Sequence, residues 1–154
     1  SVKLKKLSEM GKIPETCHEK VYSIKQKKTI EIIEKNSKIR SEKINMIRDL
    51  KDRGLKICCF TNSIRETAEL MLSTCGVLNM LDMLVTNQDV KNPKPDPEGY
   101  LKILNHFSIS PDDTVIVEDS PKGIESAIRS GCLVIGVAGC DDVNIDIFDE
   151  ILNE

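Results

Sequence analysis

The chain has 154 residues, of which 40% are hydrophobic and 31% are charged, and this length is enough for one domain with a buried core. With no Trp, two Tyr and three Phe, the core must rest mainly on aliphatic side chains. No stretch approaches the ~18 apolar residues of a membrane span, and no apolar signal region is visible at the N-terminus. We therefore expect a cytoplasmic protein with no membrane partner.

The net charge of −3 hides an uneven distribution. Residues 1–56 contain 16 Lys and Arg against 8 Asp and Glu, whereas residues 57–154 contain 6 against 17. The basic first third either attracts an anionic substrate or is a pair of solvated, lysine-rich helices. Aromatic residues are too sparse there for base stacking, so we do not expect nucleic acid as a partner.

Six cysteines are present, but none forms a CxxC pair and neither His lies at a ligand spacing, so we do not expect a zinc site. Cys58 and Cys59 lie inside an apolar run, as small buried residues do in a reducing compartment. We therefore do not expect a disulfide framework.

The first third of the chain predicts two helices. Residues 14–35 have roughly helical spacing of apolar side chains, and Pro14 suits a first helical turn. A second helix is predicted from Ser41 to about Arg53, with Ser41 as its N-cap and Gly54 as its stop.

The pattern then changes to short apolar runs that alternate with helical segments. The first run, at residues 55–60, is typical of a buried strand. The further elements are a helix at 63–75, a strand at 83–86, a proline-rich loop at 93–97, a helix at 98–107, a strand at 114–117, a helix at 121–130 and a strand at 133–137. This alternation predicts an α/β fold, a Rossmann-like parallel sheet with flanking helices, whose ligands bind at the C-terminal ends of the strands.

Polar residues follow the first predicted strand at that end. Thr61, Asn62 and Ser63 offer hydroxyl groups and backbone N–H groups where a helix begins, which is a natural pocket for an anion. The alternative is that they only cap this helix.

A lysine lies in the proline-rich loop after the second strand. Pro95 and Pro97 stiffen this loop, so Lys94 can be held over a phosphate at low entropic cost. The alternative is an ordinary lysine in a surface loop.

Two adjacent carboxylates, Glu118 and Asp119, close the third strand. Buried charges need a partner, and carboxylate oxygens suit Mg²⁺. The alternative is that Asp119 or Ser120 caps the helix that starts at Pro121. A hydroxyl, a lysine and an acidic pair, each after a strand, together indicate a site that neutralises a phosphoryl group.

The strings FTNS, KPDPEGY and VIVEDSPKGIESA, in this order, resemble motifs two, three and four of the haloacid dehalogenase-like (HAD) hydrolase superfamily, in its β-phosphoglucomutase and phosphatase branch. The resemblance covers about residues 41–139. More loosely, residues 1–35 resemble the last helices of that branch's helical cap. It implies a cap remnant at 1–38 and an α/β core at 39–154 that lacks its first strand.

The resemblance also implies roles for individual residues. Thr61 would hydrogen-bond the phosphoryl oxygens, Asn62 would contribute its backbone N–H, and Lys94 would stabilise the charge on the phosphoryl group. Asp119 would bind Mg²⁺ directly or through water, and Glu118 would support the metal. The implied activity is that of a phosphatase or phosphomutase acting on small phosphorylated metabolites.

The family's first motif, DxD, carries the aspartate nucleophile, and no DxD follows an apolar strand in this chain. We therefore expect the chain alone to be inactive and the sheet to lack a strand between those that end at Phe60 and Val117. The alternative is a non-catalytic binding module that keeps the fold. The sequence indicates neither the substrate nor the oligomeric state.

Overall fold

The computed structural model describes residues 2–152. The chain forms two compact units, Ser1–Lys38 and Ile39–Glu154. No helix within the described residues is long and apolar enough to cross a lipid bilayer. That the first unit is the remnant of a cap stays a prediction.

The first unit is helical and contains α1 (Val2–Glu9), a short 3₁₀ turn η1 (Glu15–Cys17) and α2 (His18–Asn36). The helix predicted from residue 14 is divided, because Pro14 keeps an extended backbone (φ −65°, ψ 146°) and η1 precedes α2. The lysines of α2 are all exposed, as expected for a solvated helix: Lys20, Lys25, Lys27, Lys28 and Lys35.

The second unit alternates helices with short strands. Its elements are α3 (Ser41–Asp52), β1 (Cys58–Phe60), α4 (Arg65–Thr74), η2 (Leu78–Met80), β2 (Met83–Val85), α5 (Glu98–Phe107), η3 (Pro111–Asp113), β3 (Val115–Glu118), α6 (Pro121–Ser130), β4 (Leu133–Gly136), η4 (Cys140–Asp142) and α7 (Asp146–Leu152). The α/β class predicted from the alternating pattern is therefore confirmed.

Glycines end two of these helices as predicted. Gly54 after α3 and Gly131 after α6 have φ of 88° and 84°, a left-handed backbone that side chains with a Cβ rarely adopt. The prediction that Ser41 caps α3 is wrong. The extended residue before the helix is Arg40, which makes no side-chain capping bond, and Ser41 already lies inside the helix.

The strands are parallel but form two separate pairs. Cys59 of β1 faces Leu84 of β2, and Val117 of β3 faces Ile135 of β4. Within the described part of the chain, β1 and β3 are not hydrogen-bonded neighbours. The predicted sheet is thus split where the sequence indicated a missing strand.

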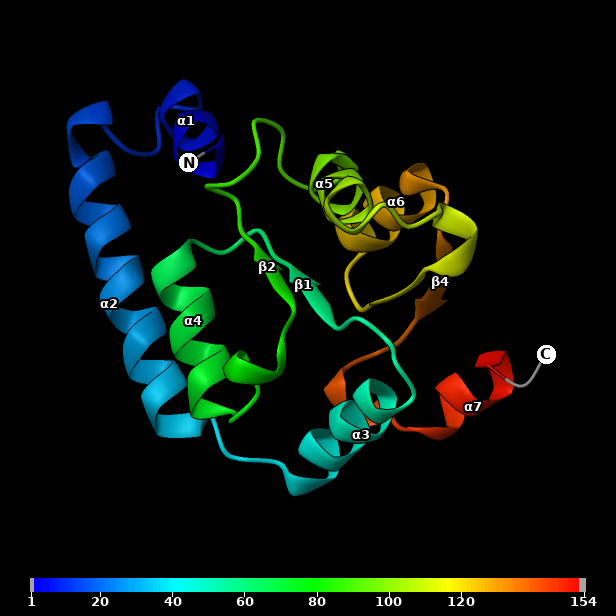
Figure 1. The fold of residues 1–154 in the computed structure, drawn as a ribbon. Coiled ribbons are helices and arrows are strands. Elements are labelled where there is room, and N and C mark those ends of the chain that lie inside the picture. Colours follow the sequence, from blue (N-terminus) through cyan, green and yellow to red (C-terminus); the bar gives the residue numbers. More distant parts are fainter. Residues whose placement is uncertain (1, 153–154) are drawn as a thin grey trace. The chain divides into compact units, whose positions relative to one another are not determined.

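Helices cover the strand pairs, and α5 and α6 lie side by side (Figure 1). α5 packs against β1 and β2, and α6 packs against β3 and β4. The core between them is mainly aliphatic, as the composition required. It contains Phe60, Val85, Tyr100, Leu104, Ile116, Ala127 and Cys132.

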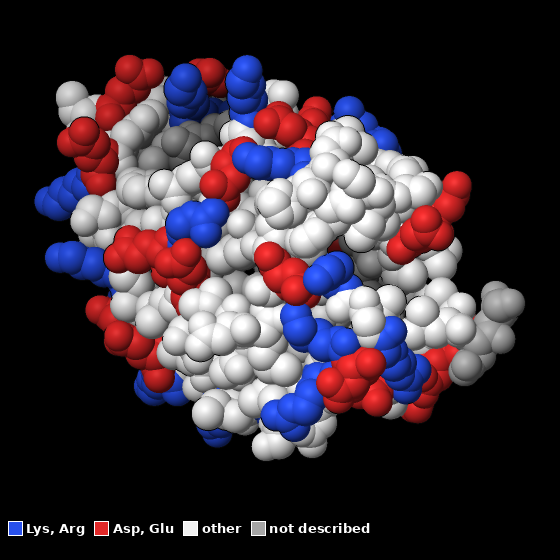
Figure 2. All heavy atoms as spheres, viewed as in Figure 1, with Lys and Arg blue, Asp and Glu red and all other residues white. Residues whose placement is uncertain are grey.

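Two helices, α1 and α7, were not predicted from the sequence. They have 8 and 7 residues, too few to show a helical period clearly. An ion pair between Arg53 at the end of α3 and Asp149 of α7, with 2.5 Å between Nη1 and Oδ1, ties α7 to the second unit. Figure 2 shows Lys and Arg side chains interspersed with Asp and Glu on the face that it presents.

Candidate functional site

A cavity of about 590 Å³ lies at the C-terminal ends of β1 and β3. All six residues that the sequence singled out line it: Thr61, Asn62, Ser63, Lys94, Glu118 and Asp119. They come from three loops that are far apart in the sequence. The rule that parallel strands place ligands at their C-terminal ends explains this meeting.

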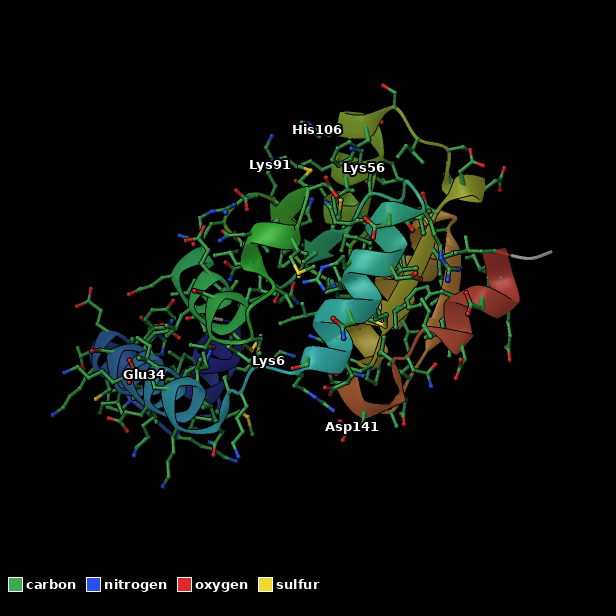
Figure 3. All side chains as sticks on the ribbon, turned by 60° about the horizontal axis from the view of Figure 1, so that its bottom comes forward. Lys6, Glu34, Lys56, Lys91, His106 and Asp141 are labelled. Atoms are coloured by element: carbon green, nitrogen blue, oxygen red, sulfur yellow. The ribbon has the colours of Figure 1, made fainter. Side chains whose placement is uncertain are left out.

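Lys94 is the central cation of this cavity and is 8% exposed. Its ammonium group donates to the carboxylate of Glu118, which is 9% exposed, and to the hydroxyl of Tyr100 at 2.9 Å. Tyr100 in turn donates to Glu118 Oε1 at 2.5 Å. A buried charge that is paired and hydrogen-bonded in this way avoids most of the desolvation cost. Lys94 is therefore not an ordinary surface lysine, unlike its loop neighbour Lys91, which is exposed (Figure 3).

Two aromatic rings complete the surroundings of the ammonium group. Lys94 Nζ lies 4.8 Å from the ring centroid of Phe60 and 4.9 Å from that of Tyr100. The two rings pack edge to face at 5.1 Å. This geometry adds cation–π attraction and restricts the position of the lysine head.

Burial and the hydrogen bond to Glu118 both raise the pKa of Tyr100 above its usual range. Because the phenol stays protonated at neutral pH, it remains a donor to the carboxylate. Burial likewise raises the pKa of the Cys59 thiol, although Lys94 opposes this shift. Cys59 therefore lines the cavity as an inert thiol.

Asn62 holds the backbone of the lysine loop. Its Oδ1 accepts from the backbone N–H of Lys94 at 3.0 Å, and its Nδ2 donates to the backbone carbonyl of Lys94 at 3.2 Å. The side-chain amide of Asn62 thus bonds both backbone groups of Lys94, as a neighbouring strand would. The resemblance implied only the backbone N–H of Asn62, so this role of the side chain is a finding of the structure.

Thr61 and Ser63 form a tight turn after β1. The Thr61 hydroxyl oxygen accepts from Ser63 N–H at 3.1 Å, and Thr61 N–H donates to Val85 O at 2.9 Å. The alternative that these residues cap the next helix is wrong. α4 begins at Arg65, and Ile64 before it makes no side-chain capping bond.

The two carboxylates at the C-terminal end of β3 lie in different surroundings. Asp119 is exposed at the cavity, whereas Glu118 is buried and bonded to Lys94 and Tyr100. The capping alternative is correct for the next residue, since Ser120 Oγ accepts from Gly123 N–H at 3.1 Å. Asp119 is therefore left available to a ligand in the cavity.

Other acidic residues do not reach this site. Asp141 lies in η4 and pairs with Arg40 at 2.6 Å, and it is labelled in Figure 3. Asp142 accepts from the N–H of Ala138 at 2.9 Å. Within residues 2–152, only Glu118 and Asp119 bring carboxylates to the lining of the cavity.

Sequence reasoning missed two residues of the site. Tyr100 bonds both members of the central ion pair, and Lys122 of α6 lines the cavity as a second cation. Tyr100 closes the string KPDPEGY, so a signal for it was present. Lys122 lies in the first turn of α6, directly after Pro121. No sequence pattern distinguished it from an ordinary surface lysine.

The fold and the cavity define an α/β protein with a polar ligand site at the ends of parallel strands. The chain belongs to the haloacid dehalogenase-like hydrolase family, whose model matches residues 3–137.

Curated relatives of the chain include phosphatases. It is similar to validoxylamine A 7′-phosphate phosphatase of Streptomyces hygroscopicus subsp. limoneus, with 33% identity over 99 residues, which are 64% of this chain and 46% of the relative. It is also similar to hexitol phosphatase A of Escherichia coli, with 36% identity over 111 residues, which are 71% of this chain and 51% of the relative. The chain thus spans about half the length of these relatives.

A solved structure supports the fold. The crystal structure of β-phosphoglucomutase from Clostridium difficile matches with a TM-score of 0.75 and 19% identity, covering 96% of this chain and 72% of that one. At this identity the likeness concerns the fold alone.

Proposed function

We propose that the cavity is the phosphate-binding half of a Mg²⁺-dependent phosphatase or phosphomutase site for small phosphorylated metabolites. The observation that carries the proposal is the meeting of a buried lysine, a turn with two hydroxyl groups and an exposed carboxylate in one cavity. Two of the chain's relatives are phosphatases named for small phosphorylated molecules or sugar alcohols, which supports the same substrate class.

In this proposal the chain's own groups bind the phosphoryl oxygens. Lys94 and the hydroxyls of Thr61 and Ser63 donate to them, together with the backbone N–H of Asn62. Phe60 and Tyr100 fix the ammonium group, so little reorganisation is needed when charge develops on the transferred group.

The residues present fit Mg²⁺, an ion that binds proteins through one or two carboxylates and keeps several waters. Asp119 would hold the ion directly or through water, because its carboxylate is exposed at the cavity. Glu118 would support it indirectly, since its oxygens are bonded to Lys94 and Tyr100. Within residues 2–152 no cluster of three potential ligands forms a complete metal cage. The bound ion would neutralise charge on the phosphoryl oxygens.

The hydrolysis of a phosphate ester through an aspartyl-phosphate needs one more carboxylate as nucleophile. The described part of the chain brings only Glu118 and Asp119 to the cavity, and both have other roles in the proposal. We therefore expect the 154 residues alone to bind phosphate without turning over esters.

Binding of orthophosphate tests the phosphate pocket without requiring turnover. Titration calorimetry should show that Mg²⁺ tightens phosphate binding. Asp119→Asn should remove the effect of Mg²⁺, and Lys94→Met should weaken phosphate binding itself at least tenfold. Asp112→Asn, at an exposed position of η3 that does not line the cavity, is the matched control. If wild-type protein binds no phosphate at millimolar concentration with Mg²⁺, the proposal is wrong.

A non-catalytic binding module is the second candidate, and the lack of a third carboxylate at the cavity, among the residues described, favours it. A panel of phosphate esters assayed with this chain and with a version extended by upstream coding sequence separates the two. Turnover by the extended version supports the phosphatase, and inertness of both with Mg²⁺ supports the module.

A further inference from the structure

Residues 91–97, between β2 and α5, form the loop that carries Lys94, and we call them the lysine loop. This loop has to hold a buried ammonium group in place without the regular bonding of a helix or strand. Side chains from several parts of the second unit bond its backbone instead. Asn62 bonds both backbone groups of Lys94 itself. Other side chains hold the stretches before and after it.

The stretch after Lys94 is held by α6. Ser126 is fully buried, and its hydroxyl donates to the carbonyl of Asp96 at 2.8 Å. One turn further along the helix, Arg129 Nη1 donates to the carbonyl of Pro95 at 3.0 Å. Two successive carbonyls of the loop are therefore fixed to one rigid helix.

The stretch before Lys94 is held by Glu98, the first residue of α5. Glu98 Oε1 accepts from the backbone N–H of Lys91 at 2.7 Å. Its Oε2 accepts from the backbone N–H of Asn92 at 2.8 Å and from the Asn92 side-chain amide at 3.1 Å. The side chain of Lys91 is exposed, so this residue takes part through its backbone (Figure 3). Both oxygens of one carboxylate thus fold the loop back onto the start of α5.

Glu98 acts on the site through this loop and not by direct contact, since it does not line the functional cavity. The bonds from the backbone N–H groups of Lys91 and Asn92 lower the pKa of Glu98, so its carboxylate is ionised at neutral pH. Hydrogen bonds to an ionised acceptor are shorter and stronger than those between neutral groups. The same negative charge disfavours an anion nearby, so any benefit to an anion site must come from the geometry of the loop.

We propose that Glu98 is a positioning residue for the phosphate pocket, which fixes the start of the lysine loop and thereby holds the Lys94 ammonium group where it meets the anion. Asn62 and α6 hold the loop at Lys94 and after it, and Glu98 supplies the support on the remaining side. A small displacement of a fixed cation strongly lowers its contribution. The inference rests on the proposed function, because it takes phosphate as the ligand of Lys94.

Titration calorimetry with orthophosphate and Mg²⁺ tests this role on the full chain. Glu98→Gln keeps one acceptor oxygen and should weaken phosphate binding about threefold, whereas Glu98→Ala keeps none and should weaken it about tenfold. Loss of a negative charge alone would tighten the binding of an anion, so the expected sign is opposite to the electrostatic effect. Glu125→Gln, at an exposed position of α6 that does not line the cavity, is the matched control and should not weaken binding.

A double-mutant cycle separates positioning from a general role in the fold. In a chain that carries Lys94→Met, the cation that Glu98 positions is gone. Glu98→Ala should therefore have almost no further effect on phosphate binding in this background. A general loss of structure would weaken binding by the same factor in both backgrounds.

Amide hydrogen exchange followed by NMR measures the loop without phosphate. In the free chain the N–H of Lys94 is bonded to Asn62 Oδ1, and Glu98→Ala should make it exchange at least tenfold faster. The N–H of Leu133, which donates to Thr114 O at 3.1 Å in the β3–β4 pair, is the internal control. Its exchange rate should not change.

Equal phosphate affinity of the wild-type chain and Glu98→Ala would overturn the proposal, and so would an additive cycle or an unchanged exchange rate at Lys94. Phosphate binding that all Glu98 variants retain in full would overturn the positioning role alone and leave the proposed function standing. If the wild-type chain binds no phosphate, the proposed function is wrong and the positioning role is wrong with it.

Discussion

Lys94 and Glu118 form an ion pair in which both side chains are almost fully buried, so each charge needs the other for its stabilisation. Lys94→Met leaves the Glu118 carboxylate without its cation, so we expect a loss of about 3 kcal/mol in the free energy of unfolding. Adding Glu118→Gln to this variant removes the unpaired negative charge and should recover much of the lost stability. Urea denaturation of the two single variants and the double variant measures the coupling.

A purely additive result in that cycle would show that the two side chains do not interact. Phosphate binding supplies a second measurement on the same proteins. The double variant should be folded and yet bind phosphate poorly, because stability is recovered without the cation.

Gly123 allows the Glu118 carboxylate to lie against the first turn of α6. A Cβ built at this position would collide with Glu118 Oε2, and the carboxylate is buried and fixed by two donors. We expect Gly123→Ala to cost about 2 kcal/mol of stability and to weaken phosphate binding, as overpacking of a fixed site does. The effect is measured by thermal unfolding and calorimetry.

Gly139 is the matched control for this substitution. Gly139 lines the functional cavity and has an extended backbone, and a Cβ there would meet nothing within 4 Å. Gly139→Ala should leave both stability and binding almost unchanged. Equal effects of the two substitutions would contradict the close contact between Gly123 and Glu118.

At the scale of elements, Asp82 joins α3 to the start of β1. Its Oδ2 accepts from Lys51 Nζ and from the backbone N–H of Ile57, both at 2.8 Å. The hydrogen bond from Lys51, followed by that from Ile57, lowers the pKa of the Asp82 carboxyl. A lowered pKa in the folded state stabilises the protein above the unfolded pKa of about 4, and this stability is lost as pH falls through the folded value.

Asp82→Asn should therefore cost on the order of 1 kcal/mol at pH 7 and less at pH 3, where protonation of the unfolded carboxyl begins to remove the effect of the charge. Asp52→Asn, at an exposed position of α3 next to Lys51, is the control and should have little effect at either pH. Denaturant unfolding at both pH values measures the difference. A constant effect of Asp82→Asn across this range would show that its charge is not involved.

The elements that the sequence predicted well combine a clear spacing of apolar residues with residues that fix where the element begins or ends. The helix ending before Gly131 starts at Pro121 as predicted, because Ser120, Pro121 and Gly131 each fix a backbone requirement. Ser41 misled the prediction, since the residue that must be non-helical there is Arg40 and a favourable residue type does not by itself select the cap.

The site followed the same logic. Parallel strands bring their C-terminal ends together, so the meeting of Thr61, Lys94 and Asp119 could be predicted from chain order. The clamp from Asn62 to the backbone of Lys94 could not, because it depends on how two loops approach across the site. The string KPDPEGY ends at Tyr100, but its bond to Glu118 could not be predicted for a similar reason, since it depends on the direction of the side chain in the first turn of α5.

At the scale of the whole molecule, the core and the candidate site belong to the second unit. The hydrophobic cluster around Phe60 and Leu104 and every residue that lines the functional cavity lie within residues 39–154. A segment with its own core can fold alone. We therefore expect a chain of residues 39–154 to unfold cooperatively, with a stability within about 1 kcal/mol of the full chain.

This shortened chain should also bind orthophosphate with unchanged affinity, because each group assigned to the phosphate is retained. Calorimetry and the dispersion of amide signals in NMR spectra measure the two properties. Loss of dispersed signals would show that residues 1–38 are needed to complete the core of the second unit. Retained folding with weaker phosphate binding would instead indicate that the basic first third contributes to attracting the anion, by an electrostatic effect that should fade as salt is added.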